Sequence, residues 1–158
     1  MPNMYMAHEA LDGCSGHEMG RKLLRRLYET HVGGEMPPVC IAPKGKPYFA
    51  ESSWHFSISH TRHYAFCVLS DCPVGIDAEE LDRKIRPDLA PRLLSPGELA
   101  QFEASRDPQK TFLSFWVLKE ATAKHSGEGV RIHPSHTNFT LPDSRVQVIS
   151  NCLVAVVY

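Results

Sequence analysis

The stretch FSISHTRHYAFCVLSDCPVGIDAE, residues 56–79, holds three strand patterns in close succession. Its first residues, 56–59, alternate apolar and serine side chains, and Trp54 extends the same period; this is typical of a strand with one buried face. Residues 64–69 form a mostly apolar run, which indicates a more deeply buried strand. Residues 74–79 follow a turn and complete the set. Three strands joined by short connections predict an antiparallel meander.

Before this stretch, one amphipathic helix is expected. Residues 20–31 place leucines and a tyrosine at helical spacing, with basic residues on the opposite side. The glycine and proline pairs that follow end the helix. No element is predicted for residues 1–17, where the pattern is weak.

After this stretch, helices and a hairpin are expected. Ser95, with Glu98 three residues later, has the arrangement of a capping box at the start of a helix. A second start signal precedes a longer helix over residues 108–124. Residues 146–158 contain two β-rich apolar runs, which predict a terminal hairpin.

Composition limits the class of protein. The length of 158 residues suits one domain, and the order of the predicted elements favours an α+β fold in two halves, residues 1–80 and 81–158. The formal net charge of −1 argues against an electrostatic nucleic-acid binder. No apolar run reaches the roughly 20 residues of a membrane helix, and no secretory signal is visible. Five cysteines without a CxxC spacing indicate reduced thiols and hence a cytoplasmic protein.

Two carboxylates lie two residues apart at the end of the third strand. Asp77 and Glu79 leave the same face, with Cα atoms about 6.5–7 Å apart. Such a pair can hold a hard cation such as Mg²⁺. A solvated strand end is the alternative interpretation of the same spacing.

A third carboxylate lies on the long helix. Glu120 shares a helical row with Phe112, Trp116 and Lys124, and the aromatic residues should turn this row toward the interior. The alternative is a surface pair between Glu120 and Lys124. If the helix acid meets the two strand acids, only a divalent cation would let them face a phosphate.

Cationic and donor groups near these acids would then face phosphate oxygens. The candidates are Lys124, Lys46 in the GKP turn, and His60 beside Ser59. For Lys46 the alternative is an ordinary turn, and for the Ser59-His60 pair it is a turn histidine without a ligand.

Four segments, in this order, resemble the 4′-phosphopantetheinyl transferases, and are most similar to their larger, pseudo-dimeric class. They are GKPYF at residues 45–49, FSISH at 56–60, VGIDAE at 74–79 and FWVLKEATAK at 115–124. The last two in combination are specific, whereas the first two alone are weak. The chain is shorter at its amino-terminal end than usual for this class.

The resemblance implies an activity and a set of partners. Members transfer the phosphopantetheine arm of coenzyme A to a serine of an apo carrier protein, require Mg²⁺, and release 3′,5′-ADP. It also implies two α+β halves related by a pseudo-two-fold axis, with a coenzyme A cleft between them. A monomer is expected, without nucleic acid or membrane as a partner.

The resemblance further implies roles for individual residues. Asp77, Glu79 and Glu120 match the metal ligands, and Glu120 also matches the candidate base. Lys124 matches a residue that steadies the pyrophosphate and the departing ADP. The remaining coenzyme A contacts implied are Ser59, His60, Gly45, Lys46 and Lys119, with Arg21 or Lys44 for the 3′-phosphate.

Two other functions remain open on the sequence alone. A relative with a shortened amino-terminal half could bind coenzyme A or a carrier protein without turnover. A metal-dependent nucleotide hydrolase on another fold would release phosphate without any carrier protein.

Overall fold

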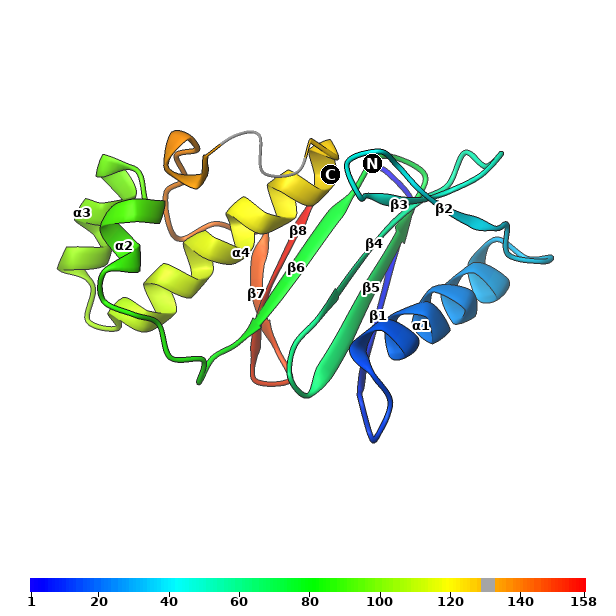
Figure 1. The fold of residues 1–158 in the computed structure, drawn as a ribbon, viewed down its shortest axis with the longest axis horizontal. Helices are drawn as coiled ribbons and strands as arrows, with labels where there is room; N and C mark the ends of the chain where they lie inside the picture. Colours follow the sequence, from blue (N-terminus) through cyan, green and yellow to red (C-terminus); the bar gives the residue numbers. More distant parts are fainter. Residues whose placement is uncertain (129–132) are drawn as a thin grey trace.

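The computed structural model describes residues 1–128 and 133–158 and shows a mixed α+β fold (Figure 1). None of the helices in these ranges is long and apolar enough to cross a membrane. The described elements are, in chain order, β1 (Met4–Ala10), α1 (Gly16–His31), β2 (Val39–Ile41), β3 (Pro47–Phe49), β4 (His55–His60), β5 (Tyr64–Ser70), β6 (Gly75–Glu80), α2 (Leu89–Leu93), α3 (Pro96–Ala104), α4 (Pro108–Ser126), the 3₁₀ helix η2 (Pro134–His136), β7 (Val146–Ile149) and β8 (Cys152–Val157).

The first sheet has the strand order β1-β5-β4, and all its pairs are antiparallel. Helix α1 covers one face, where Leu23 and Leu24 pack with Cys67 and Leu69 of β5. The helix begins earlier than predicted because the Ser15 hydroxyl accepts a hydrogen bond from the backbone of Glu18 and caps it.

The prediction of no element before residue 17 is wrong, because β1 pairs along its whole length with β5. Most of its side chains are exposed or half-buried, so apolar alternation is weak in this edge strand. Backbone pairing alone defines it, and side-chain periodicity does not report such pairing.

The predicted three-stranded meander is also wrong at its third strand. Strand β6 pairs antiparallel with β8, in a second sheet of order β6-β8-β7. The apolar face of β6 instead packs against β5, where Ile76 and Ala78 join Phe66 and Val68 in one buried cluster. The predicted hairpin of β7 and β8 is confirmed.

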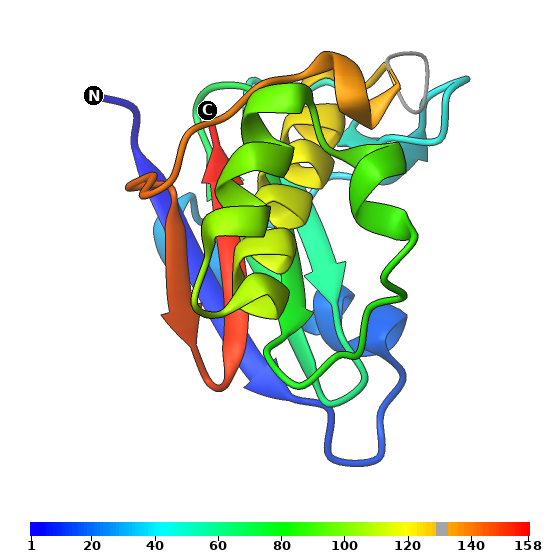
Figure 2. The same cartoon turned by 90° about the vertical axis from the view of Figure 1, so that its left-hand side faces the viewer.

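The fold therefore has four layers: α1, the first sheet, the second sheet and α4 (Figures 1 and 2). Strands β5 and β8 alternate their side chains between their own helix and the opposite sheet. In β8, Leu153 and Ala155 face the cluster under α4, whereas Cys152 and Val154 face the other sheet. The central strand of each sheet is thus buried on both faces.

Helix α4 lies directly on the start of β6. A Cβ atom at Gly75 would lie only 2.1 Å from the backbone oxygen of Ala121 and 2.5 Å from the backbone nitrogen of His125. Any larger residue would push the strand and helix apart. The helix ends at Gly127, which takes a left-handed conformation with φ of 70°. This close approach brings the last turns of α4 to the edge of the second sheet.

Candidate active site

The site is built where β4 and β6, the edge strands of the two facing sheets, lie side by side. The backbone N–H of Ile76 donates to the hydroxyl of Ser57 at 3.0 Å, and that of Ala78 donates to the hydroxyl of Ser59 at 3.1 Å. Serine side chains thus take the place that carbonyl groups have in a regular ladder. We call this junction of β4 and β6 the seam.

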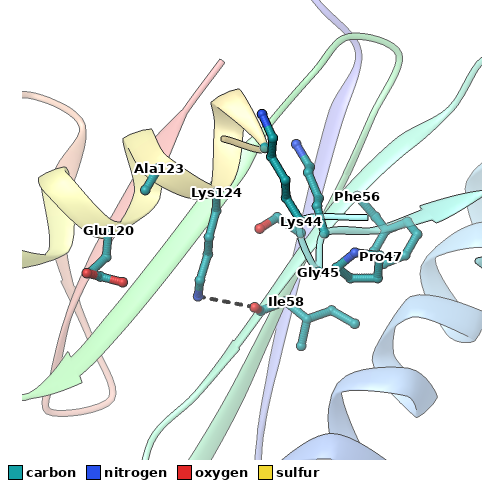
Figure 3. A pocket seen from close by; sticks show the side chains of 11 residues that line it. Lys44, Gly45, Pro47, Phe56, Ile58, Glu120, Ala123 and Lys124 are labelled. Atoms are coloured by element: carbon teal, nitrogen blue, oxygen red, sulfur yellow. Dashed lines mark hydrogen bonds between the residues drawn. The ribbon is translucent and has the colours of Figure 1, made fainter. Parts of the chain in front are cut away.

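Lys124 reaches the seam from α4. Its ammonium donates to the carbonyl oxygens of Ile58 on β4 at 3.3 Å and of Ile76 on β6 at 3.0 Å (Figure 3). It also lies 3.0 Å from Oδ1 of Asp77. One side chain therefore links α4 to both strands, which confirms that this helix face turns inward.

Asp77 is buried and unevenly satisfied. Its Oδ1 atom accepts from Lys124 and, at 3.3 Å, from the hydroxyl of Ser59, whereas Oδ2 is buried without a hydrogen-bond partner. Burial raises the pKa of Asp77 to about 6; Lys124 opposes this shift, and the charges of Glu79 and Glu120 add to it. That Asp77, Glu79 and Glu120 converge on one ion stays a prediction.

Glu120 and Glu79 are the other two acids of the predicted set, and they line different depressions of the surface. Glu120 is half-buried, and burial raises its pKa, with Lys124 opposing and Glu79 reinforcing the shift. Glu79 accepts a hydrogen bond from the guanidinium of Arg83, four residues further along the chain in the loop after β6. Arg83 was not predicted, because nothing in its local pattern marks it.

Asp77, Glu79 and Glu120 suit a hard cation in donor type. The unpartnered, buried Oδ2 of Asp77 is the kind of atom that a cation would satisfy. Within residues 1–128 and 133–158, no three acidic, histidine or cysteine side chains already converge at ligand distance. Like charges repel without a counter-ion, and Glu79 pairs with Arg83 instead.

A cavity of about 290 Å³ opens beside Lys124 and Glu120 (Figure 3). Pro47, Phe56 and Ile58 form an apolar wall opposite these two charged groups. An apolar wall with a few charged groups at one side suits a flat, partly apolar ligand that carries anionic groups. Phe56 and Ile58 were predicted only as core residues of a strand.

The GKP turn closes one side of this cavity, as its predicted role requires. Lys44, Gly45 and Lys46 all line the cavity, but both lysines already have protein partners. Lys46 donates to the carbonyl of His125 at 3.0 Å, near the carboxyl end of α4, and Lys44 pairs with Glu128. Burial lowers the pKa of Lys46. The turn is therefore fastened to the end of α4.

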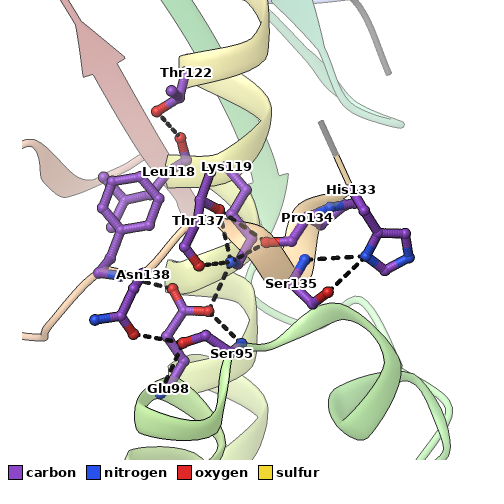
Figure 4. Close-up of polar contacts among 11 residues, drawn as sticks. Ser95, Glu98, Leu118, Lys119, Thr122, His133, Pro134, Ser135, Thr137 and Asn138 are labelled. Atoms are coloured by element: carbon purple, nitrogen blue, oxygen red, sulfur yellow. Dashed lines mark hydrogen bonds and ion pairs between the residues drawn. The ribbon is translucent and has the colours of Figure 1, made fainter. Parts of the chain in front are cut away.

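Lys119 lies elsewhere than predicted. Its side chain is 2% exposed and its ammonium is 2.6 Å from the fully buried carboxylate of Glu98 (Figure 4). It also donates to the backbone oxygens of Pro134 and Thr137, at 2.5 and 2.9 Å. This network ties α3, α4 and the segment after η2 together, so we withdraw Lys119 as a phosphate contact.

His60 and Arg21 do not line the cavity either. The imidazole of His60 covers the start of α1, so closely that a Cβ at Gly16 would lie 2.2 Å from its Cγ. His60 borders a separate surface groove together with Glu79 and Arg83. Arg21 lies on α1, among residues of that helix and the loop after it. Ser59 is buried in the seam rather than exposed to a ligand.

Comparison with known proteins identifies the family of this chain. A family model described as the 4′-phosphopantetheinyl transferase superfamily matches residues 73–154, which include β6, α4 and the start of β8. This match covers just over half of the chain, and the chain therefore belongs to that superfamily. The resemblance predicted from the sequence is confirmed.

Three individual proteins show the same similarity. The 4′-phosphopantetheinyl transferase HetI of Nostoc sp. is 34% identical over 125 residues, covering 70% of this chain and 51% of that protein. The 4′-phosphopantetheinyl transferase gsp of Aneurinibacillus migulanus is 33% identical over 56% of this chain and 37% of its own length. The 4′-phosphopantetheinyl transferase psf-1 of Bacillus pumilus is 28% identical over 71% of this chain and 50% of its own. The chain thus spans about half the length of these relatives or less.

Proposed function

We propose that this chain transfers the 4′-phosphopantetheine arm of coenzyme A to a serine of an apo acyl or peptidyl carrier protein, with release of 3′,5′-ADP. The observation that carries the proposal is the contact of Lys124 with Asp77 beside a cavity that Lys124 and Glu120 line, with all three residues inside the segment that the family model matches. The relatives named above are transferases of this kind.

Glu120 is the proposed base. It lines the cavity, and its raised pKa brings proton uptake closer to neutral pH, where a general base works best. It would accept the proton of the carrier serine hydroxyl. The serine oxygen then forms a bond to the β-phosphorus, and the bond from that phosphorus to the ADP oxygen breaks.

Lys124 is the proposed electrostatic partner of the pyrophosphate. Its ammonium is held at the seam by two carbonyl groups and Asp77, so it is positioned before substrate arrives. In this position it offsets negative charge that grows on the departing ADP. Lys44, Gly45 and Lys46 are the proposed adenine-side wall, because they line the same cavity.

Asp77, Glu79 and Glu120 are the residues that would hold Mg²⁺. The ion, when bound, would neutralise charge on the pyrophosphate. In our proposal the protein's part is to keep Oδ2 of Asp77 free for the ion, because Lys124 and Ser59 occupy only Oδ1.

We also propose that the fold consists of two halves related by a pseudo-two-fold axis and that the chain acts as a monomer in the cytoplasm. The topology supports the two halves. In each half, the first strand of the sheet is followed by helical structure and later by two more strands of that sheet, and the last strand lies in the centre of the sheet. Since β6 belongs to the second sheet, we move the proposed boundary from residue 80 to the turn at residues 71–74.

The test is incubation of the purified chain with Mg²⁺, coenzyme A and several apo carrier proteins, followed by intact mass measurement. Transfer adds the mass of one phosphopantetheine arm to the carrier, and the gain is absent without Mg²⁺. Coenzyme A binding without any mass gain would favour the binding-module alternative. Phosphate release without a carrier would favour a hydrolase.

A further inference from the structure

We propose that Ser59 is a positioning residue for Asp77, rather than the phosphate contact that the sequence suggested, and that it thereby prepares Asp77 for a divalent cation. This inference rests on the proposed function, since it concerns the same carboxylate.

The first argument is the burial of Ser59. Its side chain belongs to β4, faces the seam and is only 6% exposed. Its hydroxyl accepts from the backbone N–H of Ala78 at 3.1 Å and donates to Oδ1 of Asp77 at 3.3 Å. A hydroxyl has one proton, and here a carboxylate receives it. The hydroxyl proton is therefore not available to a ligand.

The second argument is the asymmetry that this contact gives to Asp77. Ser59 and Lys124 both donate to Oδ1, while Oδ2 is buried and has no partner in the described structure. Two donors on one oxygen fix the orientation of the carboxylate plane. The second oxygen is left for a cation, as in metal sites where outer hydrogen bonds orient the ligands.

The third argument is the comparison with Ser57, two residues earlier on the same strand. Its hydroxyl accepts from the N–H of Ile76 at 3.0 Å, so it has the same structural role in the seam. No contact between Ser57 and a carboxylate is recorded in the described structure. Among the described contacts, Ser59 reaches Asp77, whereas Ser57 lines the cavity. Because Mn²⁺ binding is measured without coenzyme A, Ser57 serves as the control for the shared role in the seam.

The experiment measures Mn²⁺ binding to the intact chain without coenzyme A or carrier, by electron paramagnetic resonance of the free ion. Ser59→Ala should weaken Mn²⁺ binding about 10-fold, the lower end of what loss of such a supporting residue costs. Ser57→Ala should stay within about twofold of wild type, although both variants lose one acceptor for a buried N–H and should show a similar fall in Tm. If Ser59→Ala does not fold, Ser59→Cys, with a weaker donor of similar size, replaces it.

Equal weakening by the two substitutions, or wild-type affinity in Ser59→Ala, would overturn the role of Ser59 while leaving the metal centre in place. Asp77→Asn tests the centre itself: it should abolish binding. If wild type binds no Mn²⁺, or Asp77→Asn binds as wild type does, the proposed centre fails and the role of Ser59 fails with it.

Discussion

The ammonium nitrogen of Lys124 lies 3.0 Å from Oδ1 of Asp77, and this contact joins the last turns of α4 to the edge strand of the second sheet. The same ammonium binds a backbone carbonyl of β4, in the first sheet. A single lysine therefore holds together the three elements that surround the candidate site.

Replacing Glu120 by glutamine should lower the transfer rate at least about 100-fold, because the amide cannot accept the serine proton. The melting temperature should stay the same or rise, since a half-buried carboxylate with a raised pKa is removed. Carrier mass gain over time and thermal unfolding are the two measurements. Glu103→Gln, an exposed acid on α3, is the control. A nearly wild-type rate would contradict the assigned base.

Replacing Asp77 by asparagine should stabilise the metal-free protein at neutral pH by up to about 3 kcal/mol, while lowering activity. Burial raises the pKa of Asp77 from 3.8 to about 6, so the folded state binds this proton more tightly than the unfolded state. The resulting stability is present below pH 4 and is lost as the pH rises to about 6.

Urea unfolding of both proteins at several pH values tests this sign. The stability of wild type relative to Asp77→Asn should fall between pH 4 and pH 6 and then level off. A variant that is less stable than wild type at pH 7, without metal, would show that the ion pair with Lys124 outweighs burial.

Replacing Lys46 by methionine should raise the pKa of His125 and of His55. Burial lowers both values, and the charge of Lys46 lowers them further. Because the folded state binds these protons less tightly than the unfolded state, the protein loses stability as the pH falls below 6.5. The variant should lose less stability over the same pH range. Titration of the imidazole signals by NMR measures both shifts. Lys110→Met, an exposed change at the other end of α4, should leave them unaltered.

Replacing Lys119 alone by methionine should cost about 3–5 kcal/mol of stability, because the carboxylate of Glu98 would remain buried without its cation. The double change Glu98→Leu with Lys119→Met should recover most of that loss, since an apolar pair carries no buried charge. Chemical denaturation of the three proteins decides this. A double variant no more stable than the single one would indicate that the hydrogen bonds of Glu98 to the chain after η2 matter more.

Local sequence patterns were sufficient to predict those elements that a single segment determines. Apolar spacing located α1, and a start signal located α4. Glu98 shows the limit of such signals. It was identified as a capping residue, and it does accept from the backbone of Ser95, but its second partner, Lys119, is known only once α3 packs on α4.

The strand partners of β1 and β6 could not be predicted, for a related reason. The apolar pattern of β6 shows that one face is buried, but it does not show which strand pairs with β6. Only the tertiary fold decides that Asp77 pairs with Ala155 of β8. The contacts of Ser59 were missed on the same ground, because a short SH pair does not reveal that its hydroxyl points into a junction between sheets.

The seam resembles an interface between two subunits, although both of its sides belong to one polypeptide. Hydroxyl groups and an ammonium, rather than a continuous backbone ladder, join β4 to β6, and each sheet is complete on its own side of residues 71–74. Two fragments produced by cleavage in that turn would each retain three paired strands and a covering helix. Mixing such fragments should rebuild the candidate site, as two separate chains do when they form a heterodimer.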